Sequence, residues 1–285
     1  MKMALFACEI GKLLLLKNLL TRFKLPLYRL LLYGLNPLII IELTGNLHFE
    51  AVMIFFLLLG IYFLSHRKLL YSAMAVSASI ASKLLPLLFL PLLIRRLGWK
   101  KSIYYFLAVG SFLLILFFPL VSLSFLTGFS ESLNLYFQKF EFNASIYYLI
   151  NWIGWQLRGF NMIQTIGPAL AITAGLLILL KAWKDKSIDL DSFFPAALFA
   201  ICVYLFCTTT VHPWYVSLPV VLCVFTRFRF PILWSVLIFF TYLNYQPHGY
   251  QEQLWVVAIE YLLVGGYLLY ELKNDRASSF NKRTA

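Results

Sequence analysis

The stretch from Leu35 to Glu50, LNPLIIIELTGNLHFE, places several polar side chains at the end of a hydrophobic run. These side chains are Glu42, Asn46, His48 and Glu50. Pro37 interrupts the run, and Gly45 precedes the apolar residues 51–64, so the pattern predicts a helix, a tight turn and a second helix. An ionisable group at the edge of a membrane helix is a candidate for a functional site. The alternative is that each group only caps a helix end or bonds to lipid headgroups.

Lys83 is a second candidate, because it is a cation inside a hydrophobic segment at 69–94. Basic residues flank that segment on both sides, so both ends are expected in the cytoplasm. A full crossing in each direction needs about 40 residues. The segment therefore predicts two short re-entrant helices that meet near Lys83 and Pro86, with the amine facing a carboxylate, a lipid phosphate or water. The alternative is one kinked helix whose Lys83 side chain extends to the membrane surface.

The third candidate is the sequence TTTVHPWY, which contains His212, Trp214 and Tyr215. Threonine, histidine and tyrosine offer hydrogen-bond donors to a phosphate, and the aromatic rings offer a face to a sugar. The alternative is an aromatic anchor at the membrane surface. A metal site shared by His212 and His48 has little support, because neither a His pair at helical spacing nor an acidic cluster accompanies them, and no metal is predicted.

The composition identifies the class of protein that must position these residues. Of 285 residues, 61% are hydrophobic and only 13% are charged, whereas charged residues make up about a quarter of a soluble domain. Several apolar runs approach the length of a membrane-spanning helix, so the sequence predicts an all-α, polytopic transmembrane bundle. The net charge of +12 comes from short Lys and Arg clusters between these runs, which argues against nucleic-acid binding.

The expected organisation has three parts. Residues 1–26 form an amphipathic segment on the cytoplasmic surface, without the small-residue cleavage site of a signal peptide. Residues 27–272 form the transmembrane bundle, with about seven crossings and the re-entrant or kinked pair. Within it, the aromatic stretch 121–161 is expected as an interfacial helix pair or a platform on the outer side. Residues 273–285 are expected as a basic cytoplasmic tail.

The distribution of basic residues orients the predicted bundle. Of 24 Lys and Arg residues, only Lys139 and Arg158 fall in the predicted outer loops and only Lys83 lies within the membrane. The other 21 lie on the cytoplasmic side, which predicts a multi-pass protein of the cytoplasmic membrane with a cytoplasmic C-terminus. His48, His212 and His248 are expected outside, so the chemistry is expected on the outer face.

Taken together, these motifs resemble those of a known protein family. The order of NPLIIIELTGNLHFE, Lys83 in its broken segment, FNASIYY with Asn143, and TTTVHPWY is similar to the bacterial GT-C superfamily of polytopic glycosyltransferases, over residues 28–261. It most resembles the mannosyltransferases that use polyprenyl-phosphate mannose. The resemblance implies transfer of a hexose, with mannose favoured, from a polyprenyl-phosphate donor to a lipid, glycan or protein acceptor. It implies no soluble cofactor, and its only other partners are membrane lipids.

The resemblance also implies roles for residues. Lys83 and His212 would contact the donor phosphate, with Asn46, Asn143, Trp214 and Tyr215 as further substrate-binding residues. His48 and Glu50 would lie beside the acceptor. In the family the general base lies in an outer loop near the N-terminus, whereas residues 1–26 contain only Glu9 as an acid. We therefore expect either that the chain is a C-terminal portion of such an enzyme or that Glu50, and next Glu42, serves as the base.

Two other classes of function remain open at this point. A transporter or flippase for a lipid-linked glycan would place polar residues along a path through the bilayer, whereas most of those here gather at one predicted face. A non-catalytic membrane subunit is the other alternative, because it needs no catalytic acid. No nucleotide-binding loop or hydrolase motif is present in a usable context, so soluble nucleotide chemistry has no signature.

Overall fold

A computed structural model describes residues 1–246 and 249–284, so His248 lies outside the described residues. The fold is an all-α polytopic bundle, as the sequence predicts, with one short antiparallel hairpin of β1 (Tyr245–Gln246) and β2 (Gly249–Tyr250). The longer helices are α1 (Lys2–Arg22), α3 (Glu50–Ser65), α4 (Leu69–Ser82), α6 (Trp99–Phe117), α7 (Leu123–Gln138), α8 (Ile146–Arg158), α9 (Ile163–Lys184), α10 (Phe193–Cys207) and α13 (Leu254–Thr284). The shorter ones are η1 (Leu27–Leu30), α2 (Leu31–Gly34), η2 (Ile39–Gly45), η3 (Leu85–Leu93), α5 (Ile94–Leu97), η4 (Phe118–Leu120), η5 (Pro213–Val216), α11 (Ser217–Cys223), α12 (Phe230–Leu237) and η6 (Ile238–Asn244).

Three helical stretches in the described residues are long and apolar enough to cross a membrane: Trp99–Leu120, Ile163–Lys184 and Leu254–Asn274. A fourth span is possible if Leu27–Gly34 and Ile39–Gly45, which are bent by 64° relative to each other, form one crossing. The bend falls around Pro37, where the sequence predicts a break, because proline removes a backbone donor. The remaining expected crossings are apolar helices of 10–17 residues, so their status as crossings stays a prediction.

Helices α3 and α4 form a close antiparallel hairpin. Gly60 allows the approach, since a β-carbon there would lie 2.6 Å from Cγ2 of Val76. The hydroxyl of Ser72 donates to the carbonyl of Gly60 at 2.8 Å and also bonds to the hydroxyl of Tyr105 in α6. Small residues that let backbones approach are typical of helix packing in membranes. The hairpin therefore fixes the positions of its two open ends, Glu50 and Lys83.

The predicted interruption in residues 69–94 is present. Helix α4 ends at Ser82, Lys83 has an extended backbone with φ −160° and ψ 142°, and the chain continues as the 3-10 helix η3. Pro86 stands at the start of η3 and Pro91 lies inside it, which keeps the segment from continuing as a regular α-helix. The stretch 121–161 likewise contains a helix pair, α7 and α8, joined by an extended connection at Phe142.

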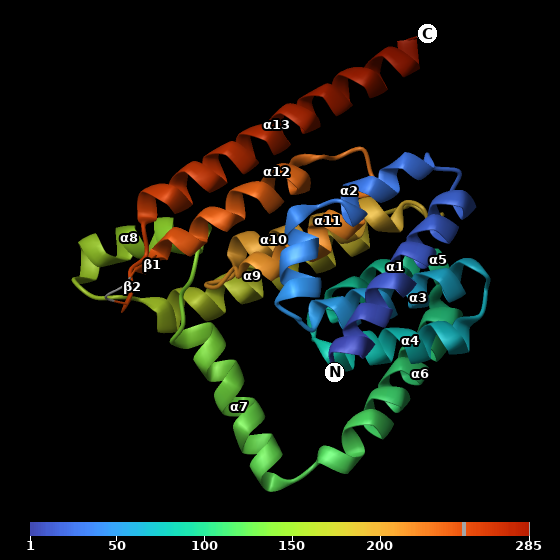
Figure 1. Cartoon of the computed structure of the whole chain (residues 1–285), viewed down its shortest axis with the longest axis horizontal. Coiled ribbons are helices and arrows are strands. Elements are labelled where there is room, and N and C mark those ends of the chain that lie inside the picture. The colour runs from blue at the N-terminus through green and yellow to red at the C-terminus, as the bar shows by residue number, and fades with distance from the viewer. Residues whose placement is uncertain (247–248, 285) are drawn as a thin grey trace.

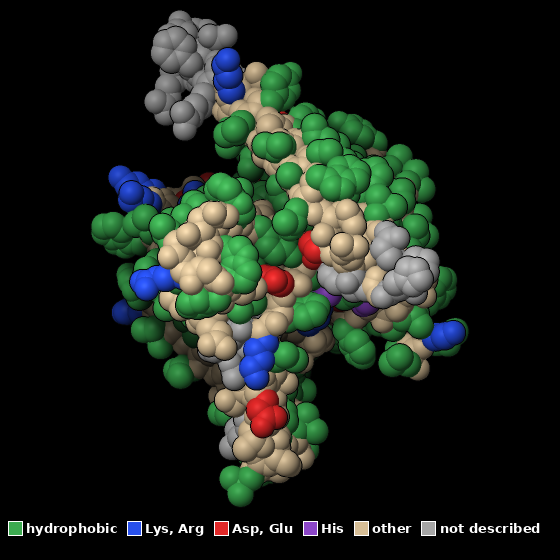
Figure 2. All heavy atoms as spheres, turned by 90° about the vertical axis from the view of Figure 1, so that its left-hand side faces the viewer, with side chains coloured by type: hydrophobic (Ala, Val, Ile, Leu, Met, Phe, Trp, Pro, Cys, Tyr) green, Lys and Arg blue, Asp and Glu red, His purple; other side chains and the backbone are tan. Residues whose placement is uncertain are grey.

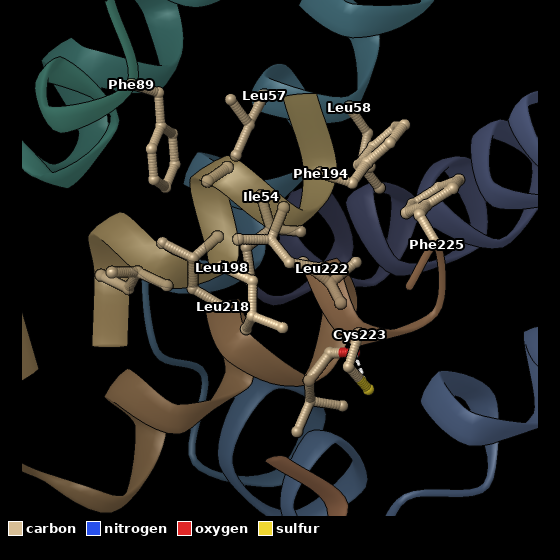
Figure 3. Close-up of a cluster of buried hydrophobic side chains, with 14 of the residues drawn as sticks. Ile54, Leu57, Leu58, Phe89, Phe194, Leu198, Leu218, Leu222, Cys223 and Phe225 are labelled. Atoms are coloured by element: carbon tan, nitrogen blue, oxygen red, sulfur yellow. Dashed lines mark hydrogen bonds between the residues drawn. The ribbon is translucent and has the colours of Figure 1, made fainter. Parts of the chain in front are cut away.

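The hydrophobic core lies where α3, η3, α10 and α11 meet. Figure 3 shows Ile54 of α3, Leu198 of α10 and Leu218 of α11 pointing toward one another, and each of them is buried. Helix α9 packs along α10, and α12 packs along α13, while in Figure 1 helices α6 and α7 diverge from them as a V. These helices carry the loops at the two ends of the bundle to common surfaces.

Helix α1 packs against α3 and contributes to this core through Leu16, Leu19 and Leu20. It also buries an ion pair, in which the amine of Lys12 lies 2.5 Å from a carboxylate oxygen of Glu9. The predicted location of residues 1–26 on the cytoplasmic surface stays a prediction, as do the other predicted domain boundaries.

Candidate functional site

The predicted turn between two helices is formed by η2, residues 46–49 and the start of α3. Leu47 has a positive φ of 61°, which makes the sharp reversal. Glu42, one turn before the end of η2, is fully buried. Its carboxylate accepts hydrogen bonds from the hydroxyl of Tyr242 at 2.6 Å and from the side-chain amide of Asn46 at 3.0 Å. These bonds stabilise its charge in a buried position.

His48 is held by Glu42 and by an aromatic ring. Its Nε2 lies 3.3 Å from a carboxylate oxygen of Glu42, and its ring stacks on Trp214 with centroids 3.7 Å apart. Burial lowers the pKa of His48, while the charges of Glu50 and Glu42 oppose that shift in part. The imidazole is therefore neutral near pH 7. Because a carboxylate only accepts, Nε2 carries the hydrogen and Nδ1 has the lone pair.

Lys83 forms an ion pair with Glu50, so a carboxylate is the partner that the structure gives to this amine. The Glu50 side chain is 1% exposed, whereas the Lys83 side chain is 30% exposed. The amine also lies 4.6 Å from the centre of the Tyr215 ring, within the range of a cation–π contact. Lys83 is thus the accessible member of a pair whose anionic member is buried.

His212 extends the aromatic cluster on its other side. Its ring stacks on Trp214 at a centroid distance of 4.5 Å and packs against Phe142 at 4.7 Å. Burial, followed by the positive charges of Lys83 and His48, lowers the pKa of His212 to about 4. The side chain is consequently a neutral hydrogen-bonding group at physiological pH. Trp214 stacks with both histidines and so connects the turn at 46–49 to the sequence HPWY.

Asn143 belongs to a neighbouring cluster. It adopts a positive φ of 47°, and its side-chain amide donates to the buried carboxylate of Glu260 at 3.2 Å. The backbone amide of Asn143 donates to Glu252 at 3.1 Å, and the indole of Trp234 donates to Glu260 at 2.8 Å. Within the described residues, the hydrogen bonds of Asn143 go to Glu252, Glu260 and Tyr261 rather than to the Lys83 cluster. The two clusters are connected through the preceding residue, Phe142, which packs on His212.

Apart from Asn143, the described residues that sequence reasoning singled out lie together, but sequence reasoning missed the residues that hold them in place. Tyr242 is 200 positions from Glu42 in the chain, and nothing in its surroundings marked it. Phe142 pairs with Thr210 as an isolated parallel bridge, which brings the FNASIYY stretch to the TTTVHPWY stretch. Figure 2 looks onto the end of the molecule that carries α8 and the hairpin, where acidic and histidine side chains lie close together near the middle.

The described residues contain no group of three or more His, Cys, Asp or Glu side chains that could hold a metal ion. The chemistry available in the described cluster is that of an accessible amine, a neutral imidazole with a fixed tautomer and a stack of aromatic rings. An amine can stabilise a phosphate anion, and a neutral imidazole can accept a proton.

Comparison with known families adds an independent finding. Residues 13–98 match the model of the MptA/B family, described as the N-terminal domain of alpha-(1->6)-mannopyranosyltransferases. The match supports a mannosyltransferase-like family. It contains the turn at 46–49, Glu50 and Lys83, so the first half of the described cluster falls inside the matched region. No curated protein and no solved structure matches the chain. At this coarse level the match supports a glycosyltransferase of mannosyltransferase type, and the three long apolar helices support a membrane protein.

Proposed function

We propose that the protein transfers a mannosyl group from a polyprenyl-phosphate donor to an acceptor hydroxyl at the outer face of the cytoplasmic membrane, in the manner of the GT-C enzymes that it resembles. The observation that carries the proposal is the ion pair of Lys83 with the buried Glu50, inside the region that matches mannosyltransferases. A polyprenyl-phosphate donor leaves as a phosphate anion, and that anion needs a positive group in the transition state.

Lys83 is suited to meet this phosphate. Glu50 holds the amine from the buried side, and the remaining hydrogens of the ammonium group are available on the exposed side. Tyr215 packs against the amine from a third direction and restricts its position. In this scheme Glu50 positions Lys83. The buried, ion-paired carboxylate of Glu50 is less suited to accept a proton than the partly exposed His48.

We assign the proton acceptor to His48, oriented by Glu42. The acceptor oxygen forms a bond to the anomeric carbon as the bond from that carbon to the phosphate oxygen breaks. The bonding electrons leave with the polyprenyl phosphate, and the hydroxyl proton passes to Nδ1 of His48. Glu42 keeps the hydrogen on Nε2 and stabilises the imidazolium that forms, as a carboxylate does for other catalytic histidines.

An apolar groove beside Asn143 offers a place for the isoprenoid chain of the donor. Its volume is ≈ 540 Å³, and it lies between α8 and α13, with Trp152, Phe206 and Leu262 among its lining residues. Ala144 and Ser145 line its near end, two residues from the Phe142 ring that contacts His212. A chain bound with its phosphate end at Ala144 and Ser145 would place the phosphate toward the Phe142 and His212 rings.

The test measures mannosyl transfer from polyprenyl-phosphate mannose in membranes of a host that makes the protein. We expect Lys83→Met and His48→Gln each to lower kcat by at least 10²-fold, since acid–base positioning and charge stabilisation typically contribute this much. Lys101→Met, an exposed lysine at the start of α6, serves as the matched control and should stay within about twofold of wild type.

The two roles are separable by the dependence of kcat on pH. His48→Gln should remove the loss of rate on the acidic side, because that loss reports protonation of the imidazole. Lys83→Met should lower the rate at every pH, and the decrease in rate on the acidic side should remain. Unchanged transfer in Lys83→Met would refute the phosphate role. Loss of activity in Glu50→Gln, combined with normal activity in His48→Gln, would reassign the base to Glu50.

A further inference from the structure

A second polar cavity lies at the other end of the bundle, away from Lys83. It has a volume of ≈ 400 Å³, opens to the surface and is lined by three segments that are distant in sequence, at 23–29, 191–195 and 225–228. Arg22, next to this cavity, donates a hydrogen bond to the carbonyl of Ser65 at the end of α3. Since α3 begins at Glu50 and has 16 residues, its two ends are separated by roughly 24 Å. The cavity is therefore remote from the proposed transfer site.

Arg29, which lines the cavity, and Arg229, just beyond it, converge on the C-terminal end of α11. Nη1 of Arg29 donates to the carbonyl of Thr226 at 3.0 Å, and Nη1 of Arg229 donates to the same carbonyl at 2.9 Å. The Nε of Arg29 is buried, and no hydrogen-bond partner is recorded for it within the described part of the chain. The exposed Arg227 also lines the cavity, with its guanidinium 5.9 Å from the ring of Phe228.

The nearest carboxylate is that of Glu271, which accepts hydrogen bonds from the backbone amides of Arg229 at 2.7 Å and Phe230 at 3.0 Å rather than from a guanidinium group. Across the described ranges, no carboxylate oxygen is recorded within 4.0 Å of the guanidinium of Arg29 or Arg229. The contrast is Arg96, whose guanidinium is 3.0 Å from Asp185 and is neutralised by it. The one acidic side chain that lines the cavity is the exposed Asp191, and its carboxylate accepts from the backbone amide of Ser192 at 2.7 Å.

The apolar part of the cavity wall consists of aromatic rings. Phe194 and Phe225 are stacked with their centroids 3.9 Å apart, and Phe23 meets Phe194 edge-on at 5.3 Å. The cavity thus combines guanidinium and hydroxyl groups with a hydrophobic surface in one space. That combination fits an amphipathic anion, with its phosphate on the arginines and its hydrocarbon on the rings.

We propose that this cavity binds the headgroup of an anionic phospholipid from the leaflet at the basic end of the bundle. Arginine guanidinium groups recognise phosphate through paired donors, and basic cavities between membrane helices bind anionic headgroups. The phosphate lies between Arg29 and Arg227, and the glycerol and first acyl carbons contact Phe194 and Phe225. This lipid links α1, α10 and α11, and the site is independent of mannosyl transfer.

The experiment uses the full chain in nanodiscs and measures by native mass spectrometry which lipids remain bound after transfer to detergent. The two lipids compared are phosphatidylglycerol and phosphatidylcholine, with inorganic phosphate as competitor. We expect phosphatidylglycerol to be retained at least fivefold more than phosphatidylcholine, and Arg227→Gln to lower that preference about fivefold, the effect expected for one basic residue at a membrane surface. Arg95→Gln, an exposed arginine that does not line the cavity, is the control and should change the preference less than twofold.

We choose Arg227 for the variant because Arg29 also caps the C-terminal end of α11, and replacing Arg29 would disturb folding as well as lipid binding. Equal retention of the two lipids would overturn the proposal. Equal losses in Arg227→Gln and Arg95→Gln would overturn it as well, since they would indicate only a general surface charge. Complete displacement of phosphatidylglycerol by inorganic phosphate would overturn the lipid assignment and give the cavity to free phosphate instead.

Discussion

Replacing Lys83 with methionine removes one charge of an ion pair whose other member, Glu50, is 1% exposed. The carboxylate then remains buried without its cation, and its second oxygen already has no recorded hydrogen-bond partner in the described residues. Breaking a buried pair from one side costs about 3 to 5 kcal/mol, because an uncompensated charge stays in a region of low polarity. Such a loss is a large part of the total stability of a typical protein, which is about 5 to 15 kcal/mol.

The double variant Lys83→Met/Glu50→Gln separates stability from chemistry. It removes both charges, so we expect it to recover most of the stability that the single variant loses. Transfer of mannose should stay at the level of the single variant, because the amine that faces the donor phosphate is still missing. Glu50→Gln alone should have an intermediate effect on transfer, since Lys83 keeps its charge and loses only its buried partner.

The assay follows thermal unfolding of the purified protein in detergent by tryptophan fluorescence, in parallel with transfer in membranes. For a chain of this size, 3 to 5 kcal/mol corresponds to a decrease of Tm of roughly 10 °C. An unchanged Tm in Lys83→Met would refute the buried ion pair. A double variant with normal transfer would refute the role of the amine, whatever its stability.

Three further predictions concern His212, Trp214 and Asp185. The pKa of His212 is lowered to about 4 in the folded protein, so between pH 6.5 and 4 the unfolded chain binds a proton at this residue more readily than the folded chain. The free energy of unfolding should therefore fall by up to about 3 kcal/mol as the pH decreases through that range. His212→Gln should flatten this dependence in a denaturant titration at several pH values. Trp214→Leu should lower transfer more than tenfold, measured as kcat/KM, because His48 and His212 both stack on the indole. Burial alone would raise the pKa of Asp185, but the Ser187 amide and Arg96 lower it overall. The stability that the Asp185–Arg96 ion pair contributes should therefore be lost as the pH falls below about 4. Asp185→Asn should remove this pH dependence of Tm in thermal scans.

The sequence predicted the elements better than the contacts between them. The apolar residues 51–64 became α3, and the first part of the segment 69–94 became α4, because length and composition are local properties of the chain. The break at Lys83 was also predictable, since a cation followed by prolines does not continue an apolar helix. By contrast, Tyr242 reaches Glu42 from a helix 200 residues away. A single tyrosine in an aromatic-rich chain carries no signal for such a contact.

The pairing of Lys83 with Glu50 was predictable in part. The sequence placed Glu50 in the outer turn and Lys83 at the tip of a re-entrant segment, but treated them as parts of separate motifs. Helices α3 and α4 have 16 and 14 residues and run antiparallel, so the start of the first and the end of the second reach nearly the same level. Gly60 and Ser72 then bring the two helices close enough for the side chains to meet. Close helix contact in a membrane depends on small residues, so the pattern of Gly, Ser and Ala across two neighbouring helices is the signal that would have joined the two motifs.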